Sequence, residues 1–187
     1  MRGLLASVLP LARAIDALNE TVGRAVKWLV LAATLVSATN ASLRYGFDLS
    51  SNAWLELQWY LFALIFLLGA GYTLKHNGHV RIDVLYGRYS PRTQAWVDLL
   101  GGVLFLLPVA GLLAWFSWGV FAESWAIQEV SADSGGLLRW PIKLALPVGF
   151  GLLFLQGVAE IIKRAGMLAG QLPFAAEFAT EQSEEIV

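Results

Sequence analysis

The side chains best suited to chemistry in this sequence lie in one short polar stretch. His76, His79 and Asp83 are spaced so that, on a helix, three metal-ligating groups would share one face. Gly78 stands between the two histidines and disfavours a helix there, and the sequence offers no evident fourth ligand. We therefore favour a solvated loop that faces lipid headgroups over a metal site, and we expect no metal and no cofactor.

Patterns for other chemistry are missing from the sequence. Both histidines lie in that one stretch, so none is available within an apolar helix to ligate haem, and there is no Cys for thiolate chemistry. We find no nucleophile motif, phosphate-binding loop or pair of carboxylates at catalytic spacing. These observations argue against a membrane enzyme or electron carrier, and we expect no enzymatic activity.

Composition indicates a membrane protein. Hydrophobic residues make up 57% of the chain and charged residues only 14%, whereas about a quarter of a soluble domain is charged. Mean hydropathy is +0.61. Four stretches lack Asp, Glu, Lys and Arg: Trp28–Leu43, Leu57–Leu74, Leu99–Ala122 and Leu144–Ala159. We predict an all-α membrane protein with four transmembrane helices at about 26–47, 53–74, 92–122 and 141–163.

Local signals mark the expected helix ends. Asn52 is a candidate cap for the second helix, and Ser90 followed by Pro91 has the pattern of an N-cap and first residue for the third. Pro141 has the same role in the fourth. Pro108 lies inside the third helix, so we expect a kink there.

The segments that flank the four helices are more polar. Residues 1–24 have apolar residues at spacings of three and four, which predicts an amphipathic helix along the inner membrane surface. A signal peptide cleaved near Ala12-Arg13-Ala14 is the alternative. Residues 25–165 then form the four-helix transmembrane domain, and residues 166–187 a polar cytoplasmic tail.

Basic residues predict the orientation. If the N-terminus is inside, only Arg44, Arg139 and Lys143 of the 13 Lys and Arg residues fall in the outer segments. Because basic residues are retained on the cytoplasmic side, this distribution places both termini in the cytoplasm.

The membrane interior carries little that could bind an ion. Ion-coupled transporters mark their pathway with intramembrane ionisable residues, and the four uncharged runs contain none. Polar residues such as Asn40 and Gln156 are the kind that tie helices together. The chain is therefore expected to be a helical partner of another membrane protein. A self-sufficient four-helix transporter, acting as a homo-oligomer, is the alternative; it would require an acidic residue such as Glu56 to lie deep in the membrane.

Two segments resemble a known family. Leu57-Gln58-Trp59-Tyr60-Leu61-Phe62 and the run from Leu68-Gly69-Ala70-Gly71 through Lys75-His76-Asn77-Gly78-His79-Val80-Arg81-Ile82-Asp83-Val84 resemble the small, DctQ-like membrane subunit of tripartite ATP-independent periplasmic (TRAP) transporters. The four-helix plan is similar over about residues 20–165.

The resemblance implies a location and partners. It implies a multi-pass protein of the bacterial inner (cytoplasmic) membrane, a large permease subunit, and a periplasmic binding protein that delivers an organic acid. Uptake would be driven by an ion gradient, and this subunit would brace the static part of the large one.

Candidate contact residues fall into three groups. His79, Arg81 and Asp83 are expected to fix the inner loop, or else to contact phospholipid headgroups.

The other two groups lie at the outer face. Glu56, Gln58 and Trp59 are candidates for contact with the large subunit or the binding protein, with helix capping and membrane anchoring as the alternative. The acidic residues of the outer loop are candidates for docking the binding protein, with an ordinary hydrated loop favoured over docking: Glu123, Glu129 and Asp133.

Overall fold

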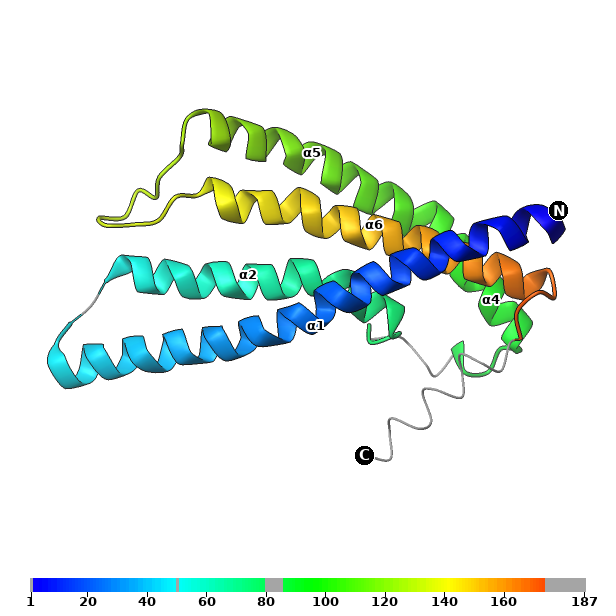
Figure 1. The fold of residues 1–187 in the computed structure, drawn as a ribbon, viewed down its shortest axis with the longest axis horizontal. Coiled ribbons are helices and arrows are strands. Elements are labelled where there is room, and N and C mark those ends of the chain that lie inside the picture. The colour runs from blue at the N-terminus through cyan, green and yellow to red at the C-terminus, as the bar shows by residue number, and fades with distance from the viewer. Residues whose placement is uncertain (1, 50, 80–85, 174–187) are drawn as a thin grey trace.

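Helices account for nearly all of the regular structure. The computed structural model describes residues 2–49, 51–79 and 86–173, with the side chains of residues 2–6 excepted. Its elements are α1 (Arg2–Phe47), α2 (Asn52–Lys75), α4 (Pro91–Gly101), the π-helix η1 (Gly102–Leu106), α5 (Leu107–Ala126) and α6 (Trp140–Leu168) (Figure 1).

Within the described residues, four helical segments are long and apolar enough to cross a membrane. They are Ser7–Phe47, Asn52–Lys75, Pro91–Ala126 and Trp140–Leu168. The predicted all-α architecture with four such helices is therefore confirmed. In Figure 1 the connections at 47–52 and 127–139 lie at one end, which we call the hairpin end, and α1 crosses α6 towards the other end, which we call the crossing end.

The first helix is longer than expected. The predicted amphipathic helix and the first predicted spanning helix are one continuous element, α1, and the boundary drawn at residue 24 matches no break in it. Ala12 and Ile15 are buried against Ala159 of α6, so part of the apolar stripe packs on the bundle. Leu11 and Leu18 of the same stripe remain exposed. Contact between this stretch and the membrane surface stays a prediction.

The third spanning segment is irregular where Pro108 predicted it. The π-helical turn η1 (Gly102–Leu106) immediately precedes α5, which has Pro108 in its first turn. Proline has no amide hydrogen, and its ring would clash with the carbonyl four residues earlier, that of Leu104. A π turn at this point removes the regular α-helical pairing that the proline cannot make.

Two of the three predicted helix starts are confirmed, and one is not. Ser90 caps α4 as expected, since its hydroxyl accepts a hydrogen bond from Thr93 N (3.3 Å). The prediction for Asn52 was wrong: Ser51 holds the N-cap position of α2, and Asn52 Nδ2 donates to Ser134 O (3.1 Å). A carbonyl from the loop 127–139 reaches this amide, which the sequence alone does not reveal. Pro141 lies in the first turn of α6, as expected.

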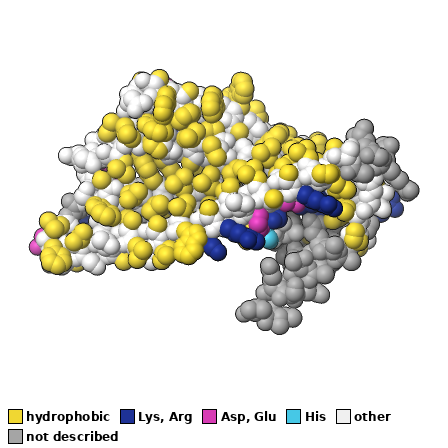
Figure 2. All heavy atoms as spheres, viewed as in Figure 1, with side chains coloured by type: hydrophobic (Ala, Val, Ile, Leu, Met, Phe, Trp, Pro, Cys, Tyr) yellow, Lys and Arg dark blue, Asp and Glu magenta, His cyan; other side chains and the backbone are white. Residues whose placement is uncertain are grey.

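A glycine in α6 allows this helix to pack closely against the backbone of α2. α6 packs against α1, α2, α4 and α5. A Cβ atom on Gly149 would lie 2.8 Å from both Leu67 Cβ and Leu67 O, so only glycine allows this approach. Large apolar side chains such as Phe66 (76% exposed) instead face outward, and Figure 2 shows a broad apolar surface over the helices.

Replacing Gly149 should loosen the bundle. Gly149→Ala forces the added methyl into the Leu67 backbone and should lower the free energy of unfolding by about 1–3 kcal/mol. Gly151→Ala, whose new Cβ would meet nothing within 4 Å, is the control in the same helix. Thermal unfolding of both variants in one detergent measures the effect, and equal melting temperatures would contradict the close contact.

Candidate functional site

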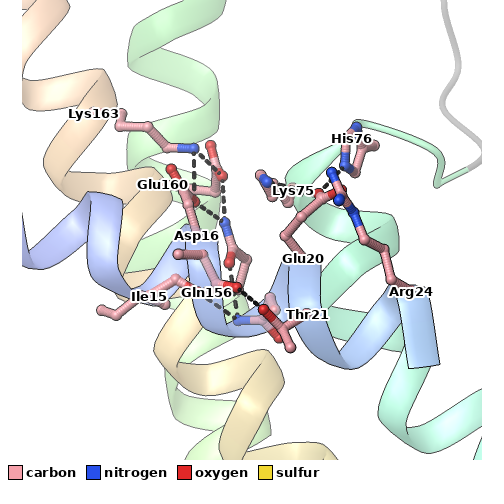
Figure 3. Close-up of polar contacts among 12 residues, drawn as sticks. Ile15, Asp16, Glu20, Thr21, Arg24, Lys75, His76, Gln156, Glu160 and Lys163 are labelled. Atoms are coloured by element: carbon pink, nitrogen blue, oxygen red, sulfur yellow. Dashed lines mark hydrogen bonds and ion pairs between the residues drawn. The ribbon is translucent and has the colours of Figure 1, made fainter. Parts of the chain in front are cut away.

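A buried amide lies where α1 crosses α6. Gln156 is fully buried, and its Nε2 donates to Asp16 Oδ1 (2.7 Å) and to Glu160 Oε1 (2.9 Å). Its Oε1 accepts from Nδ2 of Asn19 (2.9 Å), which is also fully buried (Figure 3). Every polar atom of this amide is therefore bonded to protein, and two of its three partners belong to the other helix.

Lys163 pairs with both carboxylates around this amide. Its Nζ lies 2.6 Å from Glu160 Oε1 and 3.3 Å from Asp16 Oδ1. Gln156, Glu160 and Lys163 occupy positions i, i+4 and i+7, so they share the face of α6 that meets α1. Hydrogen bonds and charge together hold the crossing.

Glu20 joins α1 to the end of α2. Its Oε2 accepts from Lys75 Nζ (2.8 Å) and lies 2.9 Å from His76 Nε2, while its Oε1 accepts from Arg24 Nε (2.9 Å). His76 also lies against the Tyr72 ring, with the centroids 4.3 Å apart. In Figure 3 the Glu20 contacts and the Gln156 contacts lie side by side along α1.

These contacts form two neighbouring groups, one around Gln156 and one around Glu20, which we together call the crossing cluster. Its members come from α1, α2 with its C-cap residue, and α6: Asp16, Asn19, Glu20, Lys75, His76, Gln156, Glu160 and Lys163. The arrangement holds three helices and presents no nucleophile beside a base. Among the residues that the structure describes, no three His, Cys, Asp or Glu side chains gather closely enough to hold a metal ion.

Part of this cluster could be predicted from the sequence. Gln156 was expected among the polar groups that tie helices together, and its hydrogen bonds to α1 confirm this. Asp16 and Glu20 had been assigned no partner. The spacing of Asp16, Asn19 and Glu20 at i, i+3 and i+4 was the available signal, since it gathers three polar groups on one helix face.

Another ion pair at the crossing end joins α4 to α6. Arg164, whose side chain is only 6% exposed, has its Nε 3.1 Å from Asp98 Oδ2, and the same oxygen accepts from Tyr86 Oη (2.8 Å). Gln94 Nε2 donates to the Tyr86 carbonyl (3.0 Å). A cavity of about 570 Å³ lies beside this pair and is also lined by Glu160. The sequence analysis singled out neither Asp98 nor Arg164.

Glu56 organises the hairpin end. Its carboxylate accepts hydrogen bonds from Leu137 N (2.7 Å) and from the Ser131 hydroxyl. Tyr60, one turn further along α2, donates from its hydroxyl to Leu138 O (3.1 Å). Two residues near the start of α2 thereby hold the loop 127–139 over the end of the bundle.

The loop is also folded on itself. Ser131 N donates to Leu137 O (2.9 Å), and Arg139 N donates to Glu129 O (2.8 Å). Glu129 pairs with Lys143 of α6, and this ammonium, followed by the Ser124 hydroxyl, holds the pKa of the Glu129 carboxyl below its usual value. The loop 127–139 is thus a compact hairpin fixed to α2 and α6, most of its residues are exposed, and the expectation of an ordinary hydrated loop stays a prediction.

The predicted contact residues are divided between the two ends. Glu56 and Glu129 come together around the loop 127–139, whereas His79 is exposed at the crossing end. Arg81 and Asp83 lie outside the described residues.

The remaining candidates at the hairpin end differ in exposure. Gln58 is half-buried and Trp59 is 74% exposed. Glu123 and Asp133 are exposed. Contact of any of these residues with a partner stays a prediction.

Comparison with known proteins identifies related sequences. Residues 33–166 match the family described as "Tripartite ATP-independent periplasmic transporters, DctQ component". Over 106 residues the chain is 35% identical to the "C4-dicarboxylate TRAP transporter small permease protein DctQ" of Pseudomonas aeruginosa, an alignment that covers 56% of this chain and 50% of the relative. The chain thus matches about half the length of that relative. No solved structure matches.

Removing the Glu56 carboxylate should release the loop. Glu56→Ala leaves Leu137 N and Ser131 Oγ without their acceptor, so amide exchange in residues 127–139 should accelerate about tenfold. Hydrogen exchange read by mass spectrometry gives the rate. Glu123→Ala, at an exposed carboxylate of the same end, is the control and should change nothing. Unchanged exchange in Glu56→Ala would show that the loop is held by other contacts.

Removing the Gln156 amide should weaken the helix crossing. Gln156→Leu keeps a similar volume but removes one hydrogen-bond partner each from Asn19 and Asp16, which should cost about 1–2 kcal/mol of unfolding free energy. Gln58→Leu makes the same change in α2, at a half-buried side chain outside the crossing cluster, and serves as the control. Urea or thermal unfolding in detergent compares the two variants. If both have the same unfolding free energy, the Gln156 hydrogen bonds do not stabilise the crossing.

Proposed function

The chain belongs to the DctQ family of TRAP transporter components, and we propose that it is the small accessory subunit that braces a large permease subunit during uptake. Four helices capable of spanning a membrane agree with a membrane subunit of a transporter. The resemblance seen in the sequence is confirmed at the level of the family.

The positions of the ionisable side chains support the bracing role. Ionisable groups gather towards the two ends of the bundle, where they bond neighbouring helices or the loop 127–139. The four uncharged runs between them provide no ionisable group for an ion or acid in transit. A bundle built in this way is a fixed support, and the transport pathway belongs to a partner.

The partners follow from the tripartite arrangement of the family. We propose a large membrane permease, which holds the substrate and coupling-ion sites, and a periplasmic binding protein, which delivers an organic acid. The relative from Pseudomonas aeruginosa is named for C4-dicarboxylates, and this name supports the class of substrate. The driving force is an ion gradient across the bacterial inner membrane.

The orientation is part of the same proposal. With both termini in the cytoplasm, the hairpin end faces the periplasm and the crossing end faces the cytoplasm. The distribution of Lys and Arg supports this orientation, because only Arg44, Arg139 and Lys143 then lie outside. The folded loop 127–139 would be the periplasmic surface that a binding protein approaches.

The alternative of a self-sufficient homo-oligomeric transporter required Glu56 to lie deep in the membrane. Glu56 instead lies near the start of α2, where the loop 127–139 occupies its carboxylate. This placement favours the accessory role.

Affinity purification in mild detergent tests the proposal. The tagged chain, expressed in its native membrane, should co-purify with one large multi-pass permease identified by mass spectrometry. Gly149→Ala should reduce the amount of permease recovered in proportion to the loss of folded chain. Gly151→Ala should leave this amount unchanged. A chain that purifies alone, or as a homodimer that transports after reconstitution by itself, would overturn the accessory role.

A further inference from the structure

Two basic residues and a tryptophan occupy the outward face of α1. Arg24, Lys27 and Trp28 follow one another at positions i, i+3 and i+4, so they share one side of the helix. The Arg24 side chain is 72% exposed, Lys27 is exposed, and Trp28 is 65% exposed. Lys27 Nζ lies 5.8 Å from the centre of the Trp28 ring. None of the three is packed into the bundle.

This face carries excess positive charge. Arg24 pairs with Glu20, but that carboxylate is shared with Lys75 and lies beside His76, so one negative charge faces at least two cations. Among the described residues, Lys27 has no carboxylate within ion-pair distance. Its ammonium group lies over the Trp28 ring instead. An anion from outside the chain would complete the charge balance.

The position of these residues along α1 indicates where such an anion would come from. The uncharged run Trp28–Leu43 starts directly after Lys27. In Figure 2 basic side chains lie along the border of the broad apolar surface. Lys, Arg and Trp at this kind of border lie at the depth of lipid headgroups.

An apolar groove continues from this border along the same helix. It lies between α1 and α2, encloses about 630 Å³, and is lined by Val30, Ala33, Thr34, Ser37, Phe62 and Ile65. Thr34 is seven residues from Lys27, two turns along the same face. A cationic site at headgroup depth and an apolar groove beneath it match the two parts of a phospholipid.

We propose that Arg24, Lys27 and Trp28 bind the phosphate headgroup of an anionic phospholipid whose acyl chain lies in the groove between α1 and α2. The guanidinium and ammonium groups donate to the phosphate oxygens, and the Trp28 ring borders the glycerol region. This site is distinct from the inner-loop residues 79–83. It requires α1 to be in a membrane but does not require the large subunit, so it stands or falls separately from the bracing role.

Lipid retention by the purified full chain tests this site. The chain is incubated in mild detergent with equal amounts of phosphatidylglycerol and phosphatidylcholine, and retained lipids are counted by native mass spectrometry. The wild type should retain phosphatidylglycerol preferentially. In the double variant Arg24→Gln/Lys27→Gln, the ratio of retained phosphatidylglycerol to phosphatidylcholine should fall about twenty-fivefold at low salt, because each charge removed lowers it about fivefold.

Matched variants separate this site from general charge and from loss of folding. Arg44→Gln removes an exposed cation near the other end of α1 and should retain the wild-type preference. The charge-conserving double variant Arg24→Lys/Lys27→Arg should retain it as well. Thr34→Phe, which fills the groove, should weaken retention of both lipids without changing their ratio.

Several results would overturn the site. An unchanged preference in the Arg24→Gln/Lys27→Gln variant would refute the headgroup contact, as would an equal loss in Arg44→Gln. Unaltered retention in Thr34→Phe would refute the groove as the place of the acyl chain.

Discussion

A buried amide in a membrane protein has to be hydrogen-bonded within the protein, because lipid offers it no partner. Gln156 meets this requirement through Asp16 and Asn19 of α1 and through Glu160 of its own helix. These bonds exist only if α1 passes α6 at this point, so they determine where the long first helix lies. The crossing also requires a glycine in α2. A Cβ atom on Gly71 would lie 2.2 Å from Asn19 Oδ1, so a larger residue there would displace the Asn19 side chain.

The opposite end of the bundle follows the same rule with different residues. There the carboxylate of Glu56 satisfies the backbone of the loop 127–139, and Lys143 neutralises Glu129. Polar groups therefore fasten the helices at their two ends and leave the middle apolar. This distribution explains how a protein with so few charges forms a defined bundle, and it fits a subunit that supports a transport pathway built by another chain.

The charged residues of α1 have different roles at successive positions. Asp16 faces Lys163 of α6, and Glu20 is shared between Lys75 of α2 and Arg24 of α1 itself, whereas Lys27 faces the surroundings. Because both carboxylates are already bonded to cations of the bundle, they cannot neutralise Arg24 and Lys27 fully. The excess positive charge near Arg24 and Lys27 is thus a consequence of how α1 packs against α2 and α6.

The features that depend on neighbouring residues could be predicted from the amino-acid sequence. Uncharged runs of sufficient length specify spanning helices, because a charge in the hydrocarbon core is costly. Ser90 caps its helix, and Pro108 marks the irregular turn, because both effects act within a few residues of the chain. The polar motif near His79 pointed to the family for the same reason, since it is contiguous in the sequence.

Which distant residues meet is visible only in the folded protein. Asp16 and Gln156 are 140 residues apart, and Asn52 and Ser134 are 82 apart, so neither pair has a local signature. Hydropathy located the membrane-facing segments but not the continuity of α1 through residue 24, because nothing in an amphipathic pattern says whether a helix bends onto a surface or runs straight into the bundle. The partner of each polar group is fixed by the packing of whole helices, and that packing is a property of the assembled chain.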